Sequence, residues 1–113
     1  MSETETLPHW DLADIGAGAV PDPHAIAVWQ EARRRVLLAL YRTFMAGPYR
    51  SSVIGDEEAL KAALALELMG LCTLQGGGGV LSMRMARITG AGIRTVEDPE
   101  ALAKAFPLAA DSG

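Results

Sequence analysis

The sequence DEEALKAALALELMG at residues 56–70 describes a helix with almost no polar side. Asp56 supplies an N-cap, and the acidic residues after it stand where the helix dipole favours negative charge. The predicted helix runs to about Met69 and is closed by the glycine that follows. Only Lys61 and Glu67 interrupt its apolar run. A helix that is apolar on nearly all sides is buried on more than one side, so we expect a partner subunit to supply part of the cover.

After this helix the pattern changes to that of a β-hairpin. Residues 71–75 predict one strand, the four glycines at 76–79 predict a turn, and residues 80–89 predict the returning strand. Apolar and polar side chains alternate along the returning strand, so one of its faces should lie on the core. The alternation slips near Ala86 and Arg87, which predicts a bulge or a strand end there.

A long helix precedes these elements. Aspartate followed by proline at residues 22–23 begins it, and glycine followed by proline at residues 47–48 ends it. Apolar residues recur between these limits with a period of about 3.6, and Arg33 projects onto the apolar stripe. Residues 49–54 predict only a short extended link.

Two short helices are predicted near the C-terminal end. Thr89 caps a turn of helix that runs through Val96, and the cap-plus-proline pair at 98–99 begins a last helix that extends to Phe106. Two main helices, a two-stranded hairpin and a short C-terminal helix make an α+β fold, in one domain over residues 22–106.

Charge is distributed unevenly along the 113 residues. Net charge is -5 over residues 1–22, +4 over 23–94 and -3 over 95–113, which gives the total of -4. We expect residues 1–21 to form a flexible acidic arm and residues 107–113 to form a frayed tail. Such an arm either aids solubility or folds back over a basic surface and screens it from phosphate.

The order of elements, together with two short motifs, resembles the winged helix-turn-helix family. In that family a helix ends in a Gly-Leu step, matched by Gly70-Leu71, and the second wing strand leads into a Leu/Ile-Thr-x-x-Gly turn, matched by residues 88–92. The resemblance covers about residues 23–106 and implies a winged-helix-like fold that binds DNA through its recognition helix and wing. The chain departs from the family at residues 47–56, which leave barely one turn for the small helix that normally precedes the recognition helix.

The helix that matches the recognition helix is poorly suited to DNA, because it begins Asp56-Glu57-Glu58 and carries mainly alanine and leucine after that. Salt-sensitive contact with the phosphate backbone through arginine side chains is the alternative. A solvated helix face or a local ion pair would explain the same arginines. The candidates for nucleic-acid contact are Arg34, Arg35, Arg42, Arg84 and Arg87.

No set of residues for catalysis, cofactor binding or metal ligation emerges. The glycine run precedes a strand pattern and has no lysine nearby, which argues against a phosphate loop. The single cysteine, Cys72, excludes an internal disulfide and is expected to pack as a small apolar residue. His9 and His24 lack partners at ligand spacing.

Four methionines are expected to fill gaps in the core, with an adaptable binding surface as the alternative. They are Met45, Met69, Met83 and Met85. No apolar run reaches the length of a membrane-spanning helix, and no signal peptide is evident. The expectation is a soluble cytoplasmic protein that is not an enzyme and has no small-molecule substrate.

The hypothesis from sequence is a small regulatory module that acts through protein–protein contacts, as a homodimer or by docking a partner protein. The surplus apolar surface of the helix at 56–69 motivates it. The expected interface residues are Trp29, Arg33, Ala62, Ala65 and Met69. A DNA-binding transcriptional regulator is the alternative function.

Overall fold

The computed structural model describes residues 21–47, 51–76 and 84–111. Predictions for residues 1–20, including His9, and for the turn and strand residues at 77–83, including Met83, lie outside this part of the chain. The elements in chain order are α2 (Pro23–Ala46), β1 (Ser52–Ile54), α3 (Glu57–Leu68), β2 (Cys72–Gly76), β3 (Arg84–Ile88), α4 (Gly90–Glu97), α5 (Pro99–Ala105) and α6 (Pro107–Asp111).

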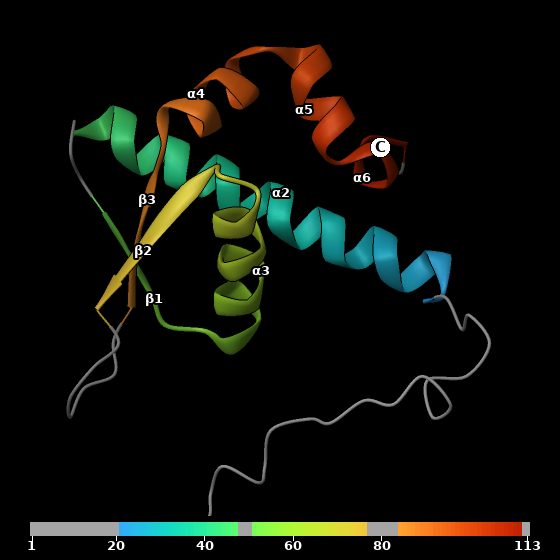
Figure 1. Cartoon of the computed structure of the whole chain (residues 1–113), viewed down its shortest axis with the longest axis horizontal. Coiled ribbons are helices and arrows are strands. Elements are labelled where there is room, and N and C mark those ends of the chain that lie inside the picture. The colour runs from blue at the N-terminus through green and yellow to red at the C-terminus, as the bar shows by residue number, and fades with distance from the viewer. Residues whose placement is uncertain (1–20, 48–50, 77–83, 112–113) are drawn as a thin grey trace, which may run out of the picture.

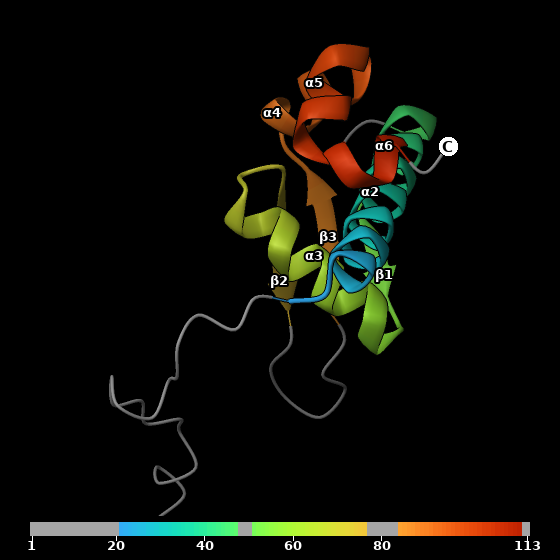
Figure 2. The ribbon, with the colours of Figure 1, turned by 90° about the vertical axis from the view of Figure 1, so that its right-hand side faces the viewer.

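The fold is α+β and is arranged around the long helix α2. Figure 1 shows α4, α5 and α6 along one side of α2, with α3 and the strands mainly on the other. The side view also places α4, α5 and α6 together at the top, above α3 (Figure 2). Within the described ranges, none of the helices combines the length and apolar character needed to cross a lipid bilayer.

The predicted helix starts are confirmed, and most rest on local capping. Asp56, Thr89 and Asp98 each accept a hydrogen bond from a backbone N–H in the first turn of the helix that follows, at 3.0–3.1 Å. Asp22 precedes α2 as predicted, but its side chain makes no capping bond, and proline at the first helical position marks that start. Gly70, with φ of 80°, follows the end of α3 in the left-handed conformation that glycine tolerates best.

The sheet has three antiparallel strands in the order β1-β3-β2. The predicted hairpin is present, and β1 adds a strand where we expected only an extended link. Its residue Ser52 pairs with Ala86, and the Ser52 hydroxyl donates to the Thr43 hydroxyl of α2 at 3.0 Å. A three-residue strand is too short for its alternation to be recognised in the sequence, and pairing with β3 is what defines it.

Of the two outcomes predicted near Ala86 and Arg87, the bulge is absent, and β3 ends at Ile88, directly after Arg87. Pairing of β2 with β3 runs without interruption from Cys72 opposite Ile88 to Gly76 opposite Arg84. Ala86 and Ile88 face the core, because Ile88 lies opposite the buried Cys72 and the pleat then turns every second residue inward.

The three predicted core methionines that the structure describes, Met45, Met69 and Met85, do not fill the core. Met85 lies on the face of β3 that points away from the core. The sequence predicted that its side chain would fill the core, so the prediction is wrong. Met45 and Met69 are also exposed, at the ends of α2 and α3. The core is closed by smaller and branched side chains, which leaves the flexible methionines on the surface.

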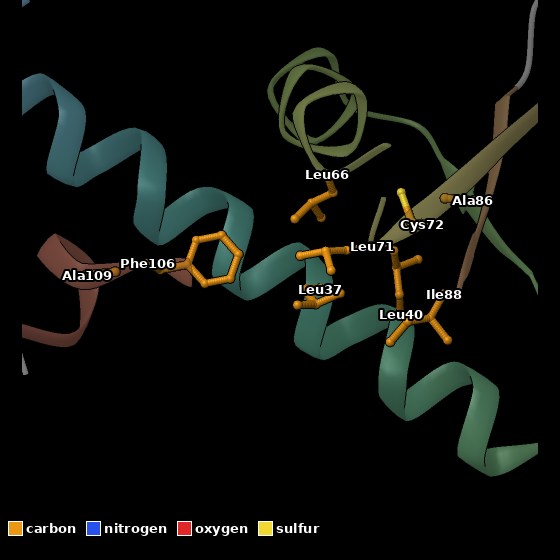
Figure 3. Packing of buried hydrophobic residues seen from close by; sticks show 9 residues of the cluster. All are labelled: Leu37, Leu40, Leu66, Leu71, Cys72, Ala86, Ile88, Phe106 and Ala109. Atoms are coloured by element: carbon orange, nitrogen blue, oxygen red, sulfur yellow. The ribbon is translucent and has the colours of Figure 1, made fainter. Parts of the chain in front are cut away.

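The core lies where α2, α3, the sheet and the C-terminal helices meet (Figure 3). Phe106, between α5 and α6, is buried and brings the C-terminal segment against α2. The buried members of the core are Leu37, Leu40, Leu66, Leu71, Cys72, Ala86, Ile88, Phe106 and Ala109.

The prediction that the chain frays after Pro107 is wrong for residues 107–111, which form α6. Ala109 is buried, and the backbone N–H of Leu108 donates to the side-chain carbonyl of Gln30 in α2 at 2.9 Å. Alanine allows a close approach between helices, but a five-residue helix is too short to show a 3.6-residue period in sequence.

Three hydrogen bonds hold α4 in place. The Thr89 hydroxyl donates to the Gly70 carbonyl at 2.7 Å, and the Thr89 backbone N–H donates to the Leu71 carbonyl at 3.0 Å. The Tyr41 hydroxyl of α2 donates to a Glu97 carboxylate oxygen at 2.7 Å, and this hydrogen bond raises the pKa of Tyr41.

Candidate interaction surface

One side of α3 is buried and the opposite side is open. Ala62, Ala63 and Leu66 face the core. Lys61, Leu64 and Leu68 follow one another at spacings of three and four residues, so they share a single exposed stripe on the opposite side. The residues that the structure describes therefore cover α3 on one side only, and Leu68, at 90% exposure, lies almost entirely in solvent.

Trp29 and Arg33 of α2 lie next to this stripe. Together with Lys61 they line a hollow of about 180 Å³ between α2 and α3, to which Glu58 and Ala62 also contribute. Trp29 is 47% exposed, so a large part of an indole ring faces solvent beside the hollow. We call Trp29, Arg33, Lys61, Leu64 and Leu68 the α2–α3 face.

The structure places the five predicted interface residues differently. Trp29, Arg33 and Ala62 all line the hollow, although Ala62 is buried and exposes only a small part of its surface. Ala65 is half-buried on α3. Met69 is exposed just beyond the end of α3, outside the residues that line the hollow.

Sequence reasoning missed the two most useful residues of this face, Leu64 and Leu68. The signal was present, because Glu57, Lys61, Leu64 and Leu68 follow a regular 4-3-4 spacing. Polar residues on that stripe mark the outward side of the helix, and the leucines in line with them are therefore exposed.

The predicted nucleic-acid residues do not form one surface that is free to bind. Arg34 lies 3.6 Å from Glu31 in an ion pair, and Arg87 has an interaction partner of its own. Arg84 is half-buried at the start of β3. Arg35 and Arg42 remain exposed on α2, two helical turns apart.

Arg35 and Arg42 line an open trough of about 600 Å³. Two acidic residues at the start of α3, Asp56 and Glu58, also line it. Its apolar lining residues are Ala32, Val36, Leu38, Ala39 and Ala59. A further hollow of about 390 Å³ shares Ala32 and Arg35 with the trough and continues along α2 to His24.

Cys72 is buried at the centre of the core, as predicted. Its thiol donates to the Ala63 carbonyl at 3.4 Å. Burial, with a smaller contribution from the charge of Glu67, raises the pKa of the thiol to about 11. The neutral thiol is thereby favoured in the folded chain, which is the opposite of what a nucleophile requires.

We predict that the Cys72 thiol makes folding stability fall between about pH 9 and pH 11. The unfolded chain releases the proton near the ordinary pKa of 9.0, whereas the folded chain holds it up to about 11. Above pH 9 the folded state therefore binds more protons, and its stability decreases as the pH rises. Urea unfolding across this range should show a steeper decline for the wild type than for Cys72→Ala, and parallel declines would contradict the prediction.

Among the described residues, no three histidine, cysteine or acidic side chains gather in a way that could hold a metal ion. His24 lies exposed in the first turn of α2. The chain matches no protein-family model, and neither a curated protein nor a solved structure is significantly similar to it.

Proposed function

We propose that the protein is a small, non-enzymatic interaction module that pairs with a second copy of itself through the α2–α3 face. The observation that carries this proposal is the exposure of Leu64 and Leu68 on α3, in line with Lys61, which borders the same hollow as the half-exposed ring of Trp29. Covering a leucine side chain contributes roughly 1.5–3 kcal/mol, so these three side chains offer a substantial gain on association.

The charges around the face favour a second copy as the occupant. A two-fold contact brings the same patch of both subunits together, so the patch must be complementary to itself. Arg33 and Lys61 are basic and Glu58 is acidic, and all three border the hollow beside Trp29. Each subunit therefore offers both signs of charge to the other.

Sedimentation over a concentration series tests this proposal. The wild type should form dimers, and Leu68→Lys should shift the equilibrium strongly towards monomer because it buries a charge in the contact. Met45→Lys is the matched control: Met45 is exposed at the end of α2, outside the face, and its replacement should leave the dimer intact. A wild type that sediments as a monomer at every concentration would refute the proposal.

A winged-helix-like organisation is part of the proposal. The order α2–β1–α3–β2–β3–α4 supports it, as do the step from α3 through Gly70 and Leu71 into β2 and the Thr89 cap at the start of α4. The chain between β1 and α3 consists of Gly55 and Asp56 alone, so no extra helix precedes α3 there. The missing helix favours protein contact over DNA recognition.

Binding to duplex DNA is the second candidate, favoured by the exposed pair Arg35 and Arg42. The acidic start of α3 at Glu57 and Glu58 opposes it, because these carboxylates would repel phosphates. Binding to duplex DNA at roughly 50 mM salt, weakened by added salt and by Arg35→Ala with Arg42→Ala, would support this candidate. Absence of binding under those conditions would eliminate it.

A further inference from the structure

The two arginines that line the trough on α2 have no ion-pair or hydrogen-bond partner among residues 21–47, 51–76 and 84–111. Arg35 and Arg42 are both exposed. Their neighbour Arg34, by contrast, lies 3.6 Å from Glu31 in an ion pair. Two guanidinium groups beside the trough are therefore available to a ligand that carries negative charge.

Arg35 and Arg42 project from nearly the same side of α2. Seven helical residues turn through about 700°, which is only about 20° short of two full turns. The two residues are about 10.5 Å apart along the helix axis, because each residue rises 1.5 Å. Ala32 and Ala39 repeat the same spacing and also line the trough. Their short side chains leave room for another backbone to lie close to α2.

The residues of α3 and its cap that line the trough carry the opposite charge. Asp56 accepts a hydrogen bond from the backbone N–H of Ala59 at 3.1 Å. Glu58 lies 3.8 Å from Lys61. The positive residues of the trough thus come from α2, and the negative residues come from the start of α3. A ligand with carboxylates on the side that meets α2 fits this distribution.

The lining favours a protein helix over a nucleic acid. The carboxylates of Asp56 and Glu58 repel phosphates, whereas a helix can place basic or neutral side chains beside them. Val36 and Leu38 add apolar lining, which suits the apolar stripe of an amphipathic helix laid in a groove.

We propose that the trough binds an α-helix of a partner protein that carries two acidic residues seven positions apart. Carboxylates at positions i and i+7 of a helix repeat every 10.5 Å or so on one side, as Arg35 and Arg42 do, so a helix alongside α2 meets both arginines. Its residues at i+3 and i+4 then lie between the two ion pairs, over Ala39, and should be apolar. The trough is complete in one chain, so the contact does not depend on dimerisation.

The two hollows on α2 set the length of the partner helix. The trough extends from Ala32 to Arg42, which is about 15 Å along α2, or nearly three helical turns. The hollow of about 390 Å³ extends the lining to His24 and includes Val28, which is 53% exposed. A helix of about 18 residues spans both hollows.

Selection from a peptide library tests the proposal. Helix-forming peptides of about 18 residues, randomised on one face and displayed on phage, are selected against the full chain at low salt. We expect the selected peptides to carry Asp or Glu at two positions seven apart, with apolar residues between them on the same side. Moving the second carboxylate to i+5 turns it about 140° away from the first, so binding should weaken about two- to fivefold through the loss of one exposed ion pair.

Reversal of charge identifies the trough as the binding site. Arg35→Glu with Arg42→Glu should weaken binding of the selected peptide at least about tenfold, because two attractions become repulsions. The same peptide with lysine at its two acidic positions should bind this variant, which also shows that the variant is folded. Leu68→Lys is the control: Leu68 lies outside the trough, so peptide binding should persist whether or not the chain dimerises.

Three results would overturn the proposal. One is a selection that yields no helical binder or no preference for the acidic pair. Another is affinity for the selected peptide that survives the reversal of Arg35 and Arg42. The third is a chain whose only ligand lost on this reversal is duplex DNA, since the trough would then be a nucleic-acid contact.

Discussion

Leu66→Ala is expected to lower the free energy of unfolding by about 3–5 kcal/mol, whereas Leu68→Ala, two residues further along α3, should change it by less than about 0.5 kcal/mol. Leu66 is 0% exposed at the centre of the core, and its truncation leaves a cavity. Leu68 is 90% exposed, so its truncation removes no contact within the chain. Urea unfolding at low protein concentration measures both changes.

Protein concentration provides the control for this pair. If Leu68 contacts a second copy, Leu68→Ala becomes destabilising relative to the wild type as the concentration rises, because association stabilises the folded state by mass action. The deficit of Leu66→Ala should be present at every concentration. Similar losses for both variants at low concentration would contradict the orientation of α3.

Gly92→Ala is expected to destabilise the fold by about 2–4 kcal/mol. Gly92 is buried in the first turn of α4, and a Cβ atom there would collide with the Leu71 carbonyl oxygen and lie 2.6 Å from Cγ1 of Ile88. The backbone must shift to make room, and that shift disturbs the hydrogen bond from the Thr89 N–H to the same Leu71 carbonyl.

Gly90→Ala is the matched control in the same helix. A Cβ atom at Gly90 meets only the end of the flexible Arg94 side chain, at 3.6 Å. Alanine has the higher helix propensity, so Gly90→Ala should leave stability unchanged or raise it by up to about 1 kcal/mol. Thermal unfolding of the two variants compares them directly, and a neutral Gly92→Ala would show that α4 does not pack closely on the Leu71 turn.

Local signals accounted for what the sequence could predict of the fold. Caps and proline positions located α2, α3, α4 and α5, because a helix start depends on a few neighbouring residues. The hairpin was predicted because the hydrophobic period changes from that of a helix to that of a strand after residue 70. These features need no knowledge of which segments meet in space.

Tertiary contacts account for what the sequence missed. Strand β1 exists because Ser52 and its neighbours pair with β3, and α6 exists because Ala109 packs against α2. The buried phase of β3 is set by Ile88 opposite Cys72, and this left Met85 outside. Each depends on a partner distant in sequence.

The α2–α3 face was likewise predicted only in part from the sequence. Trp29 and Arg33 were expected at an interface, and they do line one hollow with Ala62. Leu64 and Leu68 were not recognised, because a helix with few polar residues gives little indication of which side faces solvent. The structure settles the orientation of α3 by burying Leu66, and the leucines of the opposite side then define the surface.

In the proposed dimer, a second copy covers the α2–α3 face. An isotope-filtered NMR experiment on a mixture of labelled and unlabelled chains tests it most directly, with the methyl groups of Leu64 and Leu68 as probes. We expect contacts between these methyl groups and the α2–α3 face of the other chain, including the ring of Trp29. If no contact between chains involves these methyl groups at concentrations where the protein sediments as a dimer, the dimer is built elsewhere and the claim is wrong.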